Sequence, residues 1–162
     1  RNVVLHHYWW VGSIAVITLR SSSEEELKVF VGMELQTHAI NFVNSMDLDT
    51  HIKKFKKPNV IYLSIENSNS EVSGYFILVI EPDTESVEFQ RIVIDENCRG
   101  VGQIAITQME NYCRNKLHSK RIWLDVYEDN LVGKHIYEKL GYKKFKESTV
   151  DERALLFYQK ML

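Results

Sequence analysis

The order of apolar and polar residues divides the first part of the chain into a short strand followed by helices. Residues 14–20, IAVITLR, are few and rich in β-branched side chains, which is typical of a strand. The next stretch, SSSEEEL, places Ser and Glu at capping-box spacing with acids in the first turn. It predicts a helix through Leu27, Phe30 and Val31, and a second helical stretch is expected over about residues 35–45.

A further helix is predicted in the sequence DLDTHIKKFKK. It begins at Asp47, because a start there places Leu48, Ile52 and Phe55 on one face. Pro58 ends it, since the residue before a proline is disfavoured in the helical conformation.

Three apolar runs come next, and a short stretch of turn-forming residues separates each run from the following one. They predict strands over residues 59–66, 75–81 and 86–94. Because both connections are short, we expect the three strands to form an antiparallel meander.

After residue 99 the apolar positions change to helical spacing. The recurring residues are Val101, Ile104, Ala105, Met109, Tyr112, Cys113 and Leu117. The run RIWLDVY (121–127) predicts a buried strand, and NLVGKHIYEKL predicts a helix that starts at Asn130 and has Gly141 as its C′ residue. The segments YKKFKE and RALLFYQKML are expected to be closing strands.

Length and composition fit one domain, because 162 residues with 44% hydrophobic content can bury a substantial core. We expect this domain to span residues 14–162, after an extension over residues 1–13 without an assigned role.

A net charge of −2 argues against a nucleic-acid partner. Two cysteines make no disulfide framework and favour a reducing compartment, so a cytoplasmic location is expected. No apolar stretch reaches membrane-spanning length, and no membrane partner is expected.

The sequence ENCRGVGQIA (96–105) has the character of a phosphate-binding loop. Gly100 and Gly102 let the backbone approach a phosphate closely, and the following helix offers free N–H groups and the positive end of its dipole. The loop also fits the dinucleotide fingerprint G-x-G-x-x-G/A, with Asp125 at about the distance of the ribose-binding acid. However, DENCR separates the preceding strand from the first Gly, and one helix, one strand and a hairpin are too few for a doubly wound half.

The loop and the helix after residue 130 together resemble the GNAT superfamily of acetyl-CoA-dependent N-acetyltransferases. The family's loop reads Q/R-x-x-G-x-G/A, and this chain matches both small positions but has Asn97 first, which leaves the backbone cradle possible. The second family motif reads roughly N-x-x-A-x-x-x-Y-x-K-x-G-F. Its positions are filled by Asn130, Gly133, Tyr137, Lys139, Gly141 and Tyr142, with Gly and Tyr as mild substitutions. The resemblance is specific over about residues 73–147 and only topological over residues 14–66.

The resemblance implies a single α/β (α+β) domain with a mixed, mostly antiparallel sheet of about seven strands flanked by helices. It implies acetyl-CoA as co-substrate and no metal. The pantetheine arm is expected beside the strand that precedes the loop, where this strand splays from the next one, and a backbone N–H near Ile92 meets the oxyanion. The expected cofactor-binding residues are Ile92, Val93, Ile94, Arg99, Gly100, Val101, Gly102, Gln103 and Asn130.

The resemblance also assigns a general acid, Tyr137, which lies two helical turns after Asn130 and faces the departing sulfur. A phenol near pKa 10 protonates a thiolate near 8.5 at a cost of roughly 2 kcal/mol, which a concerted transfer tolerates. Glu88 is the candidate general base. Regular strand alternation puts it on one face with Gln90, Ile92 and Ile94, toward the acceptor side. An ordinary Glu near pKa 4.3 needs a raised pKa, a water relay or a purely electrostatic role to serve an ammonium group.

In the family the first helical region walls the acceptor pocket, which makes Glu34 and Asn41 candidate substrate-binding residues. The run VEFQ is similar to the corresponding strand of polyamine acetyltransferases and hints at a cationic acceptor. The predicted activity is therefore acetyl transfer to a primary amine, on a small molecule or a protein N-terminus, by direct attack. A homodimer is left open. Two alternatives remain: a CoA- or nucleotide-binding module without turnover, and an NAD-type oxidoreductase.

Overall fold

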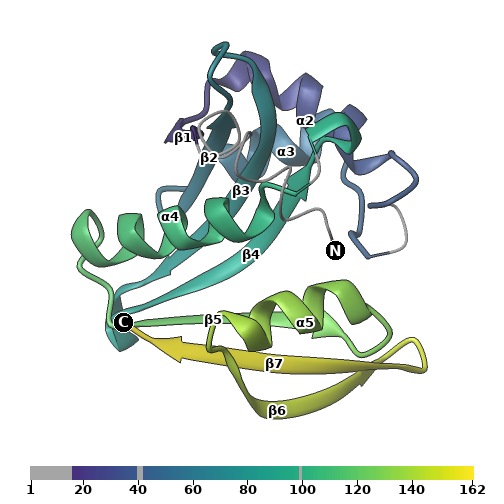
Figure 1. Ribbon diagram of the computed structural model, residues 1–162, viewed down its shortest axis with the longest axis vertical. Helices are drawn as coiled ribbons and strands as arrows, with labels where there is room; N and C mark the ends of the chain where they lie inside the picture. Colours follow the sequence, from purple (N-terminus) through teal and green to yellow (C-terminus); the bar gives the residue numbers. More distant parts are fainter. Residues whose placement is uncertain (1–15, 40–41, 99) are drawn as a thin grey trace, which may run out of the picture.

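The computed structural model describes residues 16–39, 42–98 and 100–162, which are arranged around a seven-stranded sheet (Figure 1). The strand order is β1-β2-β3-β4-β5-β7-β6. β4 and β5 pair in parallel, and every other neighbouring pair is antiparallel. The predicted mixed, mostly antiparallel sheet and its β2-β3-β4 meander are confirmed.

The elements follow the apolar pattern of the sequence closely. The strands are β1 (Thr18–Ser21), β2 (Val60–Glu66), β3 (Val72–Glu81), β4 (Ser86–Ile94), β5 (Arg121–Tyr127), β6 (Lys143–Val150) and β7 (Arg153–Met161). The α-helices are α2 (Leu27–Glu34), α3 (Leu48–Phe55), α4 (Gly102–Asn115) and α5 (Leu131–Lys139). Short 3₁₀ turns cover Glu24–Glu26, Pro82–Thr84 and Glu96–Cys98.

Predicted helix ends are confirmed where a local side chain sets them. Ser23 and Glu26 form the capping box before α2. Asp47 caps α3, since its carboxylate accepts a hydrogen bond of 2.8 Å from the Thr50 amide. Gly141 ends α5 with a φ of +95°, the left-handed conformation that glycine adopts without strain.

The helix predicted over about residues 35–45 is wrong. The described residues of this segment form turns and irregular chain after α2. Gln36 Nε2 donates to Asp95 Oδ2 at 3.2 Å, and His38 Nε2 donates to the carbonyl at the end of β4 at 2.6 Å. These two side-chain bonds connect the segment to the chain around the end of β4.

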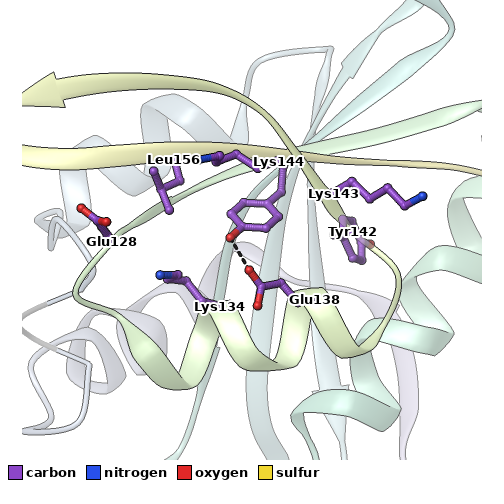
Figure 2. Close-up of a pocket in the computed structure, with 8 residues that line it drawn as sticks. Glu128, Lys134, Glu138, Tyr142, Lys143, Lys144 and Leu156 are labelled. Atoms are coloured by element: carbon purple, nitrogen blue, oxygen red, sulfur yellow. Dashed lines mark hydrogen bonds between the residues drawn. The ribbon is translucent and has the colours of Figure 1, made fainter.

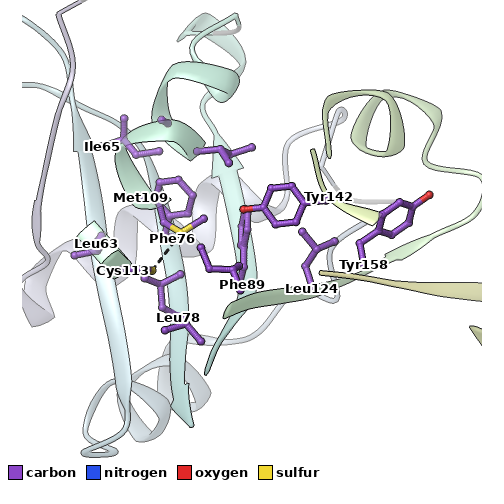
Figure 3. Packing of buried hydrophobic residues seen from close by; sticks show 14 of the residues in the cluster. Leu63, Ile65, Phe76, Leu78, Phe89, Met109, Cys113, Leu124, Tyr142 and Tyr158 are labelled. Atoms are coloured by element: carbon purple, nitrogen blue, oxygen red, sulfur yellow. Dashed lines mark hydrogen bonds between the residues drawn. The ribbon is translucent and has the colours of Figure 1, made fainter. Parts of the chain in front are cut away.

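One face of the sheet, here called the α4–α5 face, carries the larger core (Figure 3). Met109 and Cys113 of α4 pack on Phe76, Leu78 and neighbouring strand residues, and all of these side chains are almost fully buried. The apolar stripe of α5 packs against the same cluster. Burying one such side chain stabilises the fold by about 1.5–3 kcal/mol, so this core fixes both helices on the sheet.

The opposite side, here called the α2–α3 face, carries a second core. Phe30 of α2 stacks on Tyr75 of β3 with ring centroids 4.1 Å apart, and Tyr62 of β2 lies beside them. Ile52 and Phe55 of α3 pack against this cluster, as their predicted shared face requires. The aromatic stack therefore lies over β2 and β3.

A β-bulge interrupts β4 at Gln90. In the pairing with β3, Ile77 lies opposite Arg91 and Leu78 lies opposite Phe89, so Gln90 has no partner of its own in the register. A bulge inserts one extra residue, and the side chains that follow it therefore change faces. Arg91 consequently points to the α2–α3 face.

The predicted common face of Glu88, Gln90, Ile92 and Ile94 is wrong for this reason. Phe89 before the bulge packs in the core of the α4–α5 face, and so do Ile92 and Ile94 after it. Glu88 therefore lies on the α2–α3 side of the sheet, opposite to Ile92. Regular alternation could not reveal this, because the sequence of β4 contains no glycine that would mark a bulge.

β4 and β5 are joined over a short distance only. Their parallel register holds the pairs Ser86–Arg121, Val87–Ile122 and Glu88–Trp123. Beyond these pairs the two strands diverge, as Figure 1 shows. The predicted splay of the strand before the loop from its neighbour is confirmed.

The described helices include none with the length and apolar character that crossing a bilayer requires. The extension predicted over residues 1–13 lies outside the described residues, and so does the start of the strand predicted over residues 14–20.

Candidate active site

A cleft of about 810 Å³ opens where β4 and β5 diverge. Its walls come from both faces of the sheet. Gly100, Gln103, Asn130 and Tyr137 line it from the α4–α5 face, and the segment at residues 42–44 lines it near α2 and α3. A molecule in this cleft therefore meets groups from both sides of the sheet.

A second cavity, of about 350 Å³, lies between α5 and the hairpin of β6 and β7 (Figure 2). Its lining mixes Lys134, Lys143 and Lys144 with Glu128 and Glu138. The Tyr158 hydroxyl donates to Glu138 at 2.7 Å, and both residues line this cavity. None of the predicted site residues lines this cavity, whereas most of them line the larger cleft.

The predicted phosphate loop has the open backbone that a cradle needs. Gly100 has a φ of +101°, and a Cβ built at Gly100 or Gly102 meets nothing within 4 Å. α4 begins at Gly102, and its first main-chain bond runs from the Ala105 amide to the Val101 carbonyl. The amides before Ala105 therefore have no acceptor within the helix and are available to a phosphate. Val101 itself is buried in the core, and Gln103 lines the cleft.

The end of β4 lies at the cleft, and the predicted residues Ile92, Val93 and Ile94 all line it. The carbonyl of Ile94 already accepts a hydrogen bond of 2.6 Å from His38 Nε2. Because a carbonyl only accepts, His38 carries its proton on Nε2, and its buried Nδ1 has no partner among the described residues. Sequence reasoning missed His38, since an isolated His in a segment predicted as helix gives no signal of contact with β4.

Asn130 is the N-cap of α5 and lines the cleft. Its side-chain oxygen accepts a hydrogen bond of 3.0 Å from the Gly133 amide. A Cβ added at Gly133 would lie 2.8 Å from Asn130 Nδ2. Gly133, where the family motif has Ala, thus leaves room for the side chain of Asn130 to cap α5.

Tyr137 projects from α5 into the cleft. Its ring makes edge contacts with Phe89 and Tyr142, with centroids 5.8 Å and 6.0 Å away. Burial and then the charge of Asp125 raise the pKa of Tyr137 to about 12. The phenol therefore keeps its proton at neutral pH and has a fixed ring orientation.

Two carboxylates from different strands reach the same cleft. Glu88 lies on β4, and burial followed by the charges of Asp125 and Glu81 raises its pKa. Gln90 donates to Glu88 at 3.4 Å and accepts from Lys54 at 2.6 Å, so an amide separates the acid from the lysine. Asp125 on β5 also has a pKa raised by burial. Sequence reasoning considered Asp125 only as a dinucleotide acid and missed its position in the cleft.

Glu34 was predicted to bind the acceptor, but it does not line the cleft. Its side chain is fully buried under α2, where it accepts hydrogen bonds from His51, Tyr75, Arg91 and the Met46 amide. Burial alone would raise its pKa, but these hydrogen bonds and the charge of Arg91 outweigh burial and lower the pKa to about 2.

The remaining predicted residues, Asn41 and Arg99, lie outside the described residues. In the part of the chain that the structure does describe, no group of three or more His, Cys, Asp or Glu side chains is arranged to hold a metal ion.

A family model described as the acetyltransferase (GNAT) family matches residues 24–142. No curated relative matches the sequence. Among solved structures, the spermidine N-acetyltransferase of Vibrio cholerae in complex with CoA and spermine has a TM-score of 0.79 and 17% identity, over 90% of this chain and 95% of that one. A putative phosphinothricin N-acetyltransferase has a TM-score of 0.76 and 19% identity, over 91% of this chain and 99% of that one.

A dodecameric structure of the Vibrio cholerae spermidine enzyme is similar as well. Its TM-score is 0.74 and its identity 18%, over 90% of this chain and 93% of that one. At these identities the structural likeness establishes the fold, while the match over residues 24–142 establishes the lineage.

Proposed function

We propose that this chain, which belongs to the acetyltransferase (GNAT) family and is an acyl-CoA N-acyltransferase, transfers acetyl from acetyl-CoA to a primary amine by direct attack. One observation carries the proposal. A single cleft between β4 and β5 contains the open glycine loop, the raised-pKa acid Glu88 and the protonated phenol of Tyr137. Those are the groups that binding a diphosphate, activating an amine and protonating a thiolate require.

The residues for the cofactor lie on the α4–α5 face. The amides at the start of α4, with Gly100 and Gly102, fit the pyrophosphate, and the Asn130 position at the start of α5 fits the same ligand. The main chain of Ile92 and Val93, unpaired with β5, fits the extended pantetheine arm. Bound there, acetyl-CoA supplies a thioester whose acyl group is open to attack by an amine.

Glu88 is the proposed base on the acceptor side. The pKa of an ordinary carboxylate lies about six units below that of an ammonium group. The raised pKa of Glu88 makes this difference smaller, so Glu88 is a better base for the amine. Asp125 adds a second negative charge nearby, and together the two acids favour a cationic amine. The Vibrio cholerae enzyme with the same fold acts on spermidine, which supports a small cationic amine as acceptor.

Tyr137 is the proposed acid. With a pKa of about 12, full transfer of its proton to a thiolate of pKa near 8.5 would cost roughly 5 kcal/mol, more than for an ordinary phenol. Transfer is therefore concerted with cleavage of the carbon–sulfur bond, so that the proton moves only as negative charge develops on sulfur. The edge contacts with Phe89 and Tyr142 hold the ring in place for this step.

A panel of amines, comprising diamines, polyamines, amino acids and a peptide N-terminus, tests the proposal. Release of free CoA thiol and the mass of the product report turnover. We expect Tyr137→Phe to lower kcat by a factor on the order of 10²–10⁴ while the thermal shift caused by acetyl-CoA persists. Tyr112→Phe is the matched control, because Tyr112 lies on α4 outside the cleft lining.

Two results would contradict the proposal. A thermal shift with NAD and none with acetyl-CoA would indicate an oxidoreductase instead. Binding of acetyl-CoA without turnover on any amine would indicate a binding module. A homodimer remains a prediction, and sedimentation of the purified chain measures it directly.

A further inference from the structure

The buried side chain of Glu34 on α2 and the partly buried side chain of Arg91 on β4 hold the irregular segment at residues 42–46. Arg91 Nη2 donates to the carbonyl of Asn44 at 2.7 Å, and Glu34 Oε1 accepts from the amide of Met46 at 2.9 Å. Arg91 Nη1 in turn donates to Glu34 Oε2 at 2.6 Å. Residues 42–46 belong to no helix or strand. The side chains of this guanidinium–carboxylate pair therefore bond to main-chain groups that regular secondary structure would otherwise satisfy.

The β-bulge at Gln90 makes the pair possible. Arg91 lies opposite Ile77, whose side chain is in the core of the α2–α3 face, and the extra residue turns Arg91 to that same face. With regular alternation Arg91 would point to the α4–α5 face, away from Glu34. The bulge in β4 thus places Arg91 beside Glu34 and Asn44, on the acceptor side of the cleft.

The pair stays charged over the neutral pH range. The side chain of Glu34 is 0% exposed and that of Arg91 is 12% exposed. His51 Nε2 donates to Glu34 at 3.0 Å, and His51 Nδ1 shares a hydrogen bond of 2.7 Å with the Tyr62 hydroxyl. Arg91 supplies the guanidinium that pairs with the Glu34 carboxylate. The pKa of Glu34, at about 2, keeps the anion in place.

The segment that the pair holds forms a wall of the cleft. Phe42, Val43 and Asn44 line it, as does Arg91, and they lie on the side of the sheet where Glu88 lies. The phosphate loop and Asn130 lie on the other face. A change in the position of this segment would therefore alter the space for the acceptor and leave the cofactor's groups unchanged.

We propose that Arg91 is a positioning residue that, together with Glu34, holds residues 42–46 as the acceptor-side wall of the cleft and so sets the affinity for the acceptor amine. The inference rests on the proposed function, since it assigns the wall to that acceptor. Arg91 does not take part in the chemical step and does not bind the cofactor.

The test compares Arg91→Met with the double variant Arg91→Met/Glu34→Met. The single change leaves a buried carboxylate without its cation and can prevent folding, whereas removing both charges avoids that penalty. In the double variant we expect the KM for the acceptor to rise about tenfold or more, with kcat and the Kd for acetyl-CoA within about threefold of the parent. Arg91→Lys keeps the charge but loses the forked geometry, and should give an intermediate KM.

Tyr62→Phe is the matched control. It removes the bond to His51 in the same buried network and leaves the bonds to Asn44 and Met46 intact. We expect it to lower the thermal midpoint without changing the acceptor KM. An equal rise in KM for Tyr62→Phe, or an unchanged KM in the double variant, would overturn the inference.

Hydrogen exchange separates this inference from the proposed function. Amides of residues 42–46 should exchange faster in the double variant than in the parent, and not in Tyr62→Phe. Unchanged exchange overturns the role of Arg91 whatever the activity. A parent protein that turns over no amine contradicts the proposed function instead, and the exchange experiment still reports whether the pair holds the wall.

Discussion

The two walls of the cleft are built by different means. On the α4–α5 face, the wall consists of helix starts and strand backbone fixed by an apolar core, with Gly100 and Asn130 at its ends. On the α2–α3 face, the wall includes an irregular segment held by the charged pair of Glu34 and Arg91. In the proposed function, the first wall binds its ligand through main-chain groups and the second through side chains.

This difference suits two kinds of ligand. A cofactor is always the same molecule, and main-chain amides that a core holds rigidly recognise it regardless of the side chains nearby. An acceptor differs between relatives, and a wall held by a few polar bonds can change shape when one of its residues changes. The cost is that stability on the acceptor side depends on a small number of buried polar groups.

The largest expected effect compares the buried acids of the two faces. Glu34→Ala leaves Arg91 without its anion and should lower the free energy of unfolding by about 3–5 kcal/mol in urea titrations. Glu110 on α4 is its counterpart, with a bond of 3.0 Å to the partly exposed Lys160 and a contact with the Tyr142 hydroxyl. Glu110→Ala should cost less than about 1 kcal/mol, because Lys160 can turn to solvent. Equal losses would refute the contrast between the faces.

The next effect is a dependence of stability on pH. Glu34 titrates at about 2 in the fold and near 4.3 in the unfolded chain, so the unfolded state binds the proton more readily. The resulting stabilisation, roughly 3 kcal/mol, is complete above the unfolded pKa and is lost as pH falls toward 2. Urea titrations from pH 7 to 2 should show the gap between the parent and Glu34→Ala closing over this range. A constant gap would mean that Glu34 is not charged in the fold.

A smaller effect tests the cofactor wall. Gly100→Ala forces a side chain onto a φ of +101°, which costs about 1–2 kcal/mol and should weaken acetyl-CoA binding by roughly five- to thirtyfold in calorimetry. Gly32→Ala is the control, because Gly32 lies in α2 at an ordinary φ and a Cβ there meets nothing within 4 Å. It should leave binding unchanged and stabilise the helix slightly. Comparable losses in binding for both variants would argue against the loop as a cradle.

The smallest effect compares two helix caps. Asn130→Ala removes the cap of α5, which should cost about 1 kcal/mol of stability and also weaken acetyl-CoA binding a few-fold. Asp47→Ala removes the equivalent cap of α3 on the other face. It should lower the thermal midpoint without affecting acetyl-CoA binding. If both caps changed the affinity, the walls would not act separately.

The wall on the α4–α5 face could be predicted from the sequence, because the residues that indicate it lie close together along the chain. Gly100 and Gly102 mark the loop, Asn130 marks the start of α5, and the short links between apolar runs indicate the meander. Each of these features depends on residues within a few positions of each other. The family motif predicts roles for the same residues, and all three of them line the cleft.

The wall on the α2–α3 face could not be predicted in this way. Glu34 was expected to face an acceptor, and its burial depends on Arg91, which lies 57 residues further along the chain. The orientation of Arg91 depends in turn on an unmarked bulge at Gln90. His38 and Asp125 likewise reach the cleft only through contacts between distant segments.

The three paired residues between β4 and β5 also bear on the cohesion of the whole protein. This pairing has fewer residue pairs than any other pair of neighbouring strands among the described residues. If the pantetheine arm of acetyl-CoA pairs along β4 as proposed, it adds hydrogen bonds where β4 has no neighbouring strand. We therefore expect bound cofactor to strengthen the connection between the two halves of the sheet as well as to occupy the site.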